Sequence, residues 1–107
     1  MILHLTCKFE GILNDNNKIL NISLSACHEN DLTVLGYKSH TFYPQGFTAI
    51  ILLAESHLSI HTFPEKNFAL VDLFMCGAKS KKQVNNIIDK FAEKLGCEIL
   101  NKKLITR

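Results

Sequence analysis

Between residues 32 and 76 the chain contains four strand-like segments whose connections are too short to hold a helix. The segments are residues 32–42, 47–54, 58–63 and 68–76. Connections of a few residues join neighbouring antiparallel strands, whereas a parallel pair needs a crossover of about a dozen residues or more. Pro44 and Pro64 lie in two of the connections, where they favour turns. This region therefore predicts a mainly antiparallel sheet.

A further strand and a helix are predicted before this region. Residues 2–9 alternate at period two, which is typical of a half-buried strand. The apolar face of that strand consists of Leu3, Leu5, Cys7 and Phe9. A turn-rich stretch at residues 14–17 then precedes a helix that extends to about Asn30. Its apolar residues at helical spacing are Leu20, Leu24 and Cys27.

The second helix has the clearest signals in the chain. Ser80 and Gln83 have the spacing of a capping box, in which each side chain binds a free amide of the first turn. Gly96 suits the left-handed conformation that ends many helices. The apolar stripe between these ends consists of Val84, Ile87, Ile88, Phe91 and Leu95. A last strand is expected over residues 97–105.

The predicted order is strand, helix, four strands, helix, strand, which favours an α+β two-layer sandwich with both helices on one sheet face. We expect one domain over residues 1–107, because the chain is short and has no Gly/Ser linker. A chain of this size buries a modest core, and the sheet face without helices needs cover. A second copy, packed sheet to sheet into a four-layer αββα dimer, is the simplest cover.

Composition argues against several classes of function. The net charge of +2, with no dominant basic block, gives no reason to expect a nucleic-acid partner. No apolar run approaches the roughly 20 residues that span a bilayer, and the N-terminus lacks signal-peptide features, so a cytoplasmic protein without a membrane partner is expected. The four cysteines are then expected to be reduced thiols. None forms a C-x-x-C pair, so no metal site is predicted.

Residues 54–65 hold the densest group of reactive side chains. Two histidines, two serines and two glutamates lie in the run Ala-Glu-Ser-His-Leu-Ser-Ile-His-Thr-Phe-Pro-Glu. On composition alone, a solvated strand edge is the better interpretation of such a segment. The alternation places Leu58 and Ile60 on one face of the strand. The opposite face then holds His57, Ser59 and His61.

Three stretches resemble motifs of the bacterial and archaeal S-adenosylmethionine decarboxylase family. Residues 55–65 resemble the family's processing-site motif. Residues 69–77, Ala-Leu-Val-Asp-Leu-Phe-Met-Cys-Gly, resemble its second motif. Residues 40–48, His-Thr-Phe-Tyr-Pro-Gln-Gly-Phe-Thr, resemble the stretch before the cleavage strand. The three occur in the family's order and together span residues 40–77, over a third of the chain.

The resemblance implies that the chain cuts itself between Glu55 and Ser56, leaving a β chain of residues 1–55 and an α chain of residues 56–107. The Ser56 hydroxyl attacks the Glu55 carbonyl, so that the amide becomes an ester. Loss of the Ser56 α-proton releases the Glu55 carboxylate, and hydrolysis of the remaining dehydroalanine leaves a covalent pyruvoyl cofactor and ammonia. The pyruvoyl group holds S-adenosylmethionine as a Schiff base while CO₂ leaves, yielding the aminopropyl donor for spermidine and other polyamines.

By match of position, the resemblance also implies roles for five other residues. His61 is the base of the processing reaction, and Cys76 is the proton donor to the product carbon. Thr48 stands where the family commonly has a serine that supports processing. Phe42 stacks on the adenine ring, and Glu65 binds the ribose hydroxyls. The family resemblance further implies a homodimer of processed precursors.

Other interpretations stay open at this point. Lys8 stands where many relatives place an acidic residue, which leaves room for the same pyruvoyl chemistry on arginine or ornithine. An inactive, unprocessed α+β binding module would keep its chain intact. A hydrolase that uses Cys76 and His61 is disfavoured, because no third residue that would orient them can be named.

Overall fold

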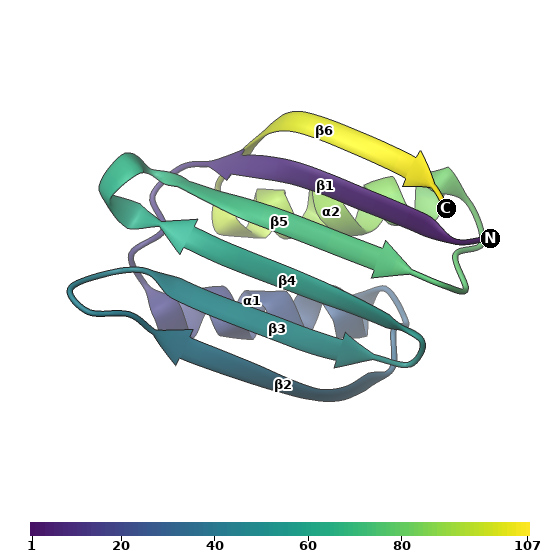
Figure 1. The fold of residues 1–107 in the computed structure, drawn as a ribbon, viewed down its shortest axis with the longest axis horizontal. Helices are drawn as coiled ribbons and strands as arrows, with labels where there is room; N and C mark the ends of the chain where they lie inside the picture. Colours follow the sequence, from purple (N-terminus) through teal and green to yellow (C-terminus); the bar gives the residue numbers. More distant parts are fainter.

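The computed structural model describes residues 1–107 and arranges six strands and two helices in two layers (Figure 1). The elements are β1 (Leu3–Glu10), α1 (Asn16–Glu29), β2 (Val34–Thr41), β3 (Phe47–Leu53), β4 (Ser56–Phe63), β5 (Phe68–Met75), α2 (Lys81–Leu95) and β6 (Glu98–Thr106), with a short 3-10 turn at Pro64–Lys66. The strand order is β2-β3-β4-β5-β1-β6, and every neighbouring pair is antiparallel. Both helices lie on one face of the sheet. The predicted two-layer α+β fold is confirmed.

The core lies between the sheet and the helices. The four residues predicted for the inner face of β1 are all buried. So are the five residues of the predicted stripe of α2. Phe9 of β1 packs edge-on against Phe91 of α2, with 5.2 Å between ring centres. Each such side chain contributes about 1.5–3 kcal/mol when it leaves water, so this layer contact holds α2 on the sheet.

Helix α1 buries a stripe that shares only Cys27 with the predicted one. Leu20 and Leu24 are only partly buried. The buried residues of the helix are Ile19, Ser23, Ala26 and Cys27. Ser23 can face the core because its hydroxyl donates a hydrogen bond of 2.7 Å to the carbonyl of Ile19. Because this hydrogen bond lets the polar Ser23 side chain be buried, the pattern of apolar residues alone does not identify the inner face of α1.

The ends of α2 follow the predicted signals with one difference. Ser80 Oγ accepts a hydrogen bond from the Gln83 amide at 3.1 Å. The Lys79 amide donates a hydrogen bond of 2.8 Å to Gln83 Oε1. In a capping box this side chain would instead accept from the amide of the N-cap residue, here Ser80. Gly96 has the expected left-handed backbone, with φ of 71°. Neither helix has the length and apolar character needed to cross a bilayer.

The sheet face opposite the helices is called the free sheet face below, and Figure 1 looks onto it. Its central residues are Thr48, Ile50 and Leu52 of β3, His57, Ser59 and His61 of β4, Leu70, Asp72 and Phe74 of β5, and His4, Thr6 and Lys8 of β1. Several are large apolar side chains with much exposed surface, including Ile50 at 46% and Leu52 at 54%. A contiguous surface of this kind is typical of an interaction site.

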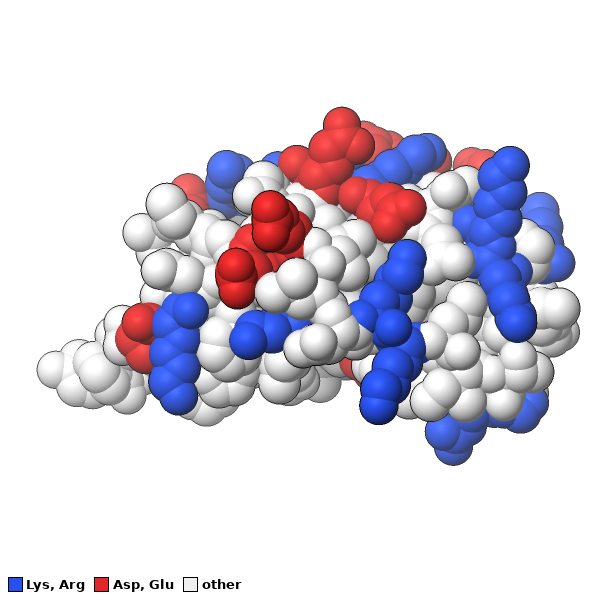
Figure 2. Space-filling view, turned by 90° about the horizontal axis from the view of Figure 1, so that it is seen from above, with Lys and Arg blue, Asp and Glu red and all other residues white.

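Charged side chains are distributed differently from these apolar residues. Figure 2 views the molecule from above Figure 1 and shows Lys and Arg interspersed with Asp and Glu. A mixture of both signs creates no large field for steering a charged ligand to this side.

Candidate active site

The bond expected to be cut lies in the tight turn between β3 and β4. Leu53 pairs with Ser56, so Ala54 and Glu55 alone connect the two strands. Strand β4 therefore begins at residue 56, two residues before the predicted start. The polar side chains of Ser56 and His57 obscure the start of the strand in the sequence.

Glu55 has a left-handed backbone conformation, with φ of 65°. The other residues with side chains and positive φ are Asp31, Asn67 and Asn101. Asp and Asn tolerate this region because their short side chains bind the local backbone, whereas glutamate does not share that advantage. A residue held there costs on the order of 1–3 kcal/mol. The Glu55–Ser56 bond thus lies where the hairpin stores backbone strain.

Strand pairing brings the predicted nucleophile and the predicted proton donor together. Ser56 pairs with Met75 at the end of β5, and Cys76 follows directly. The Cys76 amide donates a hydrogen bond of 3.3 Å to Ser56 Oγ. Ser56 also lines a cavity of about 290 Å³ that extends toward Asn30 and Gln83. The hydroxyl is therefore held in place beside the carbonyl that it is expected to attack.

The other predicted site residues gather at the opposite end of the sheet. Thr48 Oγ1 lies 2.9 Å from His61 Nδ1. Both residues line a cavity of about 510 Å³ together with Phe42 and Glu65. When Nδ1–H of His61 donates to the Thr48 hydroxyl, the lone pair of Nε2 is free to accept a proton. Thr48 is thus placed to orient the histidine that was predicted as a base.

Phe42 is a surface residue of this cavity and not part of the core. Its side chain is 49% exposed. The ring of His40, which sequence reasoning did not single out, packs edge-on against it with 4.6 Å between ring centres. An exposed ring fixed at its edge by a second ring offers a flat face to a ligand.

Within one chain the two groups of site residues are far apart. Ser56 and His61 are five residues apart on β4, which corresponds to about 16 Å along an extended strand. The two side chains also point to opposite faces, because Ser56 is on the same face of β4 as buried Leu58, whereas His61 lies on the free sheet face. His61 therefore cannot reach Ser56 of its own chain.

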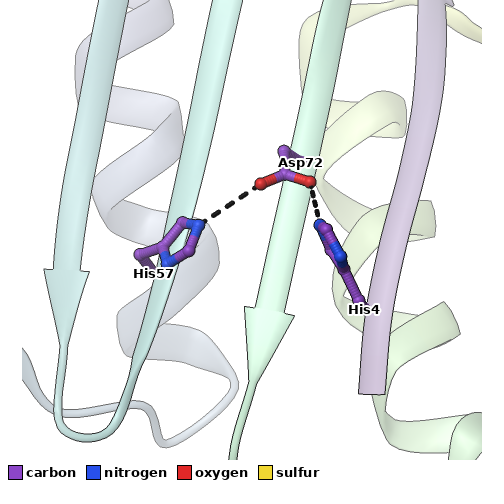
Figure 3. Close-up of polar contacts among 3 residues, drawn as sticks. All are labelled: His4, His57 and Asp72. Atoms are coloured by element: carbon purple, nitrogen blue, oxygen red, sulfur yellow. Dashed lines mark hydrogen bonds and ion pairs between the residues drawn. The ribbon is translucent and has the colours of Figure 1, made fainter. Parts of the chain in front are cut away.

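A polar cluster on the free sheet face was missed by sequence reasoning. Asp72 of β5 contacts a histidine on each neighbouring strand (Figure 3). Its Oδ1 binds His4 Nε2 of β1, and its Oδ2 lies 3.3 Å from His57 Nε2 of β4. His57 and Asp72 both fall inside the stretches that resemble the family motifs. Their co-occurrence there was the one signal available in the sequence.

Lys8 also lies on the free sheet face. Its Nζ is 4.3 Å from the centre of the Phe68 ring, a cation–π contact worth about 0.5–1 kcal/mol at an exposed site. Lys8 and His61 line a common cavity of about 510 Å³ in the middle of this face. The charge that departs from the family pattern thus lies on the same face as the predicted processing base, with Leu70 of β5 between them.

The cysteines divide into reactive and unreactive positions. Burial raises the pKa of Cys7 to about 12 and that of Cys27 to about 11. Burial also raises the pKa of Cys97. Because the thiolate is the nucleophile, these three thiols react slowly near neutral pH. Cys76 and Cys97 are both partly exposed, and because burial raises the pKa of Cys97, we expect Cys76 to react first.

A thiol reagent such as Ellman's reagent, added to the folded protein at pH 8, is therefore expected to react rapidly with about one thiol per chain. Cys76→Ser should remove the fast phase, and a denaturant should expose the remaining thiols. Raising the pH toward the folded pKa values of Cys7 and Cys27 should accelerate the slow phases. A fast phase that persists in Cys76→Ser would contradict this assignment.

Comparison with known proteins points to one family. Residues 3–107 match the family model described as S-adenosylmethionine decarboxylase. The S-adenosylmethionine decarboxylase proenzyme of Pyrococcus furiosus is 38% identical over 85 residues, which cover 78% of this chain and 61% of the relative. That of Thermodesulfovibrio yellowstonii is 40% identical over 73 residues, covering 68% and 54%. The chain thus spans somewhat over half the length of these relatives.

A solved structure shows the same fold. The crystal structure of the adenosylmethionine decarboxylase from Aquifex aeolicus is similar to this chain with a TM-score of 0.83 and 28% identity. The match covers 100% of this chain and 90% of that chain. The similarity therefore includes both helices and all six strands.

Proposed function

Because this chain belongs to the S-adenosylmethionine decarboxylase family, we propose that it cuts itself between Glu55 and Ser56 and then decarboxylates S-adenosylmethionine. The product is the aminopropyl donor for polyamine synthesis. One observation carries the proposal: the expected bond lies in a strained two-residue turn, and the attacking hydroxyl is held by the Cys76 amide. The two products are residues 1–55 and residues 56–107.

Self-cleavage uses atoms that are already adjacent. Ser56 Oγ attacks the carbonyl carbon of Glu55, the C–N bond breaks, and an ester with a free Ser56 amine forms. Removal of the Ser56 α-proton then breaks the Cβ–O bond and releases the Glu55 carboxylate. Water replaces the nitrogen, which leaves as ammonia. Strain at Glu55 assists the first step, since each 1.4 kcal/mol lost from the barrier is worth about tenfold in rate.

The residues around position 56 fit a pyruvoyl group. The Cys76 amide, which now binds a serine oxygen at 3.3 Å, can equally donate to a carbonyl oxygen at the same position. When formed, the group supplies a ketone that binds the substrate amine and draws electrons from the bond to the departing carboxylate. In this proposal the thiol of Cys76, the residue that follows β5, returns a proton to the substrate carbon. Phe42 and Glu65 bind the adenosine part of the substrate.

A homodimer completes the site in this proposal. His61, Thr48, Phe42 and Glu65 lie at one end of the sheet, and Ser56 at the other. If two copies pair through their free sheet faces about a two-fold axis that runs perpendicular to the strands, the His61 end of each copy lies over the Ser56 end of its partner. The same pairing covers the exposed apolar residues of this face. It also brings His61 of one copy to the strand end that carries Ser56 of the other, a separation of about 16 Å that His61 cannot span within its own chain.

Mass spectrometry of the purified chain tests the cleavage directly. We expect two fragments that meet between residues 55 and 56, the second of which gains mass on reaction with hydroxylamine because it carries a ketone. A single species at full mass would contradict the proposed function and favour an inactive binding module.

Phe42→Ala is expected to raise the KM for S-adenosylmethionine about fivefold with a smaller effect on kcat, since an aromatic stacking contact contributes about 0.5–1.5 kcal/mol. Release of labelled CO₂ measures both constants. Tyr43→Ala is the matched control, because the Tyr43 ring is 98% exposed and does not line the cavity. Faster CO₂ release from arginine or ornithine than from S-adenosylmethionine would instead favour the second candidate function.

A further inference from the structure

The proposed chemistry leaves the cluster of His4, Asp72 and His57 without a role. Asp72 is 31% exposed and His4 is 22% exposed, so both contacts are partly shielded from water. The three residues come from β1, β5 and β4, which are adjacent in the sheet. They are not arranged to hold a metal ion. A network of hydrogen bonds across three strands restrains the side chains that it joins, which points to positioning.

One member of the cluster, His57, directly follows Ser56 in the chain. His57 is the second residue of β4. Before cleavage the turn at Ala54 and Glu55 ties the start of β4 to the end of β3. After cleavage residue 56 is a chain end, and chain ends are poorly ordered unless other contacts hold them. A reactive group at such an end must be held by its neighbours.

His57 has the contacts to do this. Its ring stacks on Phe74 of β5, with ring centres 5.6 Å apart and planes 10° apart. Its Nε2 is directed at Asp72. His4 fixes Asp72 from the other side and lies edge-on to the same Phe74 ring, with 5.5 Å between centres. The His57 side chain is thereby held by stacking and by a carboxylate that is itself restrained.

We infer that the His4–Asp72–His57 cluster positions the new chain start at residue 56 after cleavage. This inference rests on the proposed self-cleavage. Asp72 and His4 act through His57 and do not touch the reacting atoms, so they are positioning residues. Their contribution is expected in the cleaved chain, because the intact turn performs the same task in the precursor.

Asp72→Ala tests the inference in the full chain. We expect cleavage to proceed, kcat to fall about 10- to 100-fold, and KM to change about twofold or less, because a displacement of the reacting group lowers the rate without affecting Phe42 or Glu65. Asp72→Asn keeps the shape and one acceptor oxygen, so its loss should be smaller. Glu29→Gln, which removes the negative charge that faces Lys94 in the helix layer, is the control and should behave as wild type.

Hydrogen exchange separates positioning from a general structural role. Amides of residues 57–60 should exchange about tenfold faster in cleaved Asp72→Ala than in cleaved wild type. In the uncut Ser56→Ala background, the same substitution should change these rates little. Equal acceleration in both backgrounds, unchanged kcat, or a folded but uncut Asp72→Asn would each overturn the inference. An uncut wild type would refute the proposed function instead.

Discussion

Replacing Ser56 by alanine is expected to leave the chain in one piece and without decarboxylase activity. The substitution removes the only oxygen that attacks Glu55 in the proposed reaction, so neither fragment nor pyruvoyl group forms. Loss of a covalent catalytic group lowers kcat by about 10⁴-fold or more. Mass spectrometry of the purified variant and release of labelled CO₂ measure the two effects.

The fold of this variant should be nearly unchanged. Ser56 Oγ makes one hydrogen bond, 3.3 Å from the Cys76 amide, and such a bond contributes about 0.5–1.5 kcal/mol. Thermal unfolding followed by circular dichroism should therefore show a small shift. Ser59→Ala is the matched control, because Ser59 lies on the same strand and should leave cleavage intact. Cleaved Ser56→Ala would show that the break has another origin.

The helices and strands that could be predicted are those whose sequence patterns involve residues close together in the chain. The alternation of β1 and the stripe and caps of α2 each depend on residues a few positions apart, so they were visible before any tertiary contact was known. The true inner face of α1 depends on the Ser23 hydroxyl binding its own helix backbone. The spacing of apolar residues cannot reveal that a polar side chain is buried when its hydrogen bond is made within its own helix.

The arrangement of the site depended on information that the sequence lacks. Ser56 and His61 look close because they are only five positions apart in the sequence, yet an extended strand keeps them about 16 Å apart. Conversely, His4 and Asp72 are distant in the chain, and only the strand order β5-β1 makes them neighbours. Motif resemblance can name site residues, whereas their grouping follows from strand geometry.

Co-expression of two inactive variants is expected to restore cleavage. Ser56→Ala lacks the nucleophile, and His61→Ala lacks the proposed base, so each variant alone should remain uncut. A mixed dimer contains one complete site, made of Ser56 from the His61→Ala chain and His61 from the Ser56→Ala chain. With random pairing, about half of the His61→Ala chains should be cut. The Ser56→Ala chains should stay whole.

This outcome discriminates between a base in the same chain and a base in the partner. A purification tag on one variant identifies which chain is cut, and mass spectrometry measures the fraction. Ser56→Ala co-expressed with the double variant Ser56→Ala/His61→Ala is the control, and it should yield no fragments. If His61 served its own chain, no mixed dimer would contain a complete site, and the mixture would stay uncut. Because an extended strand holds Ser56 and His61 about 16 Å apart within one chain, restored cleavage is the result expected if two chains pair as proposed.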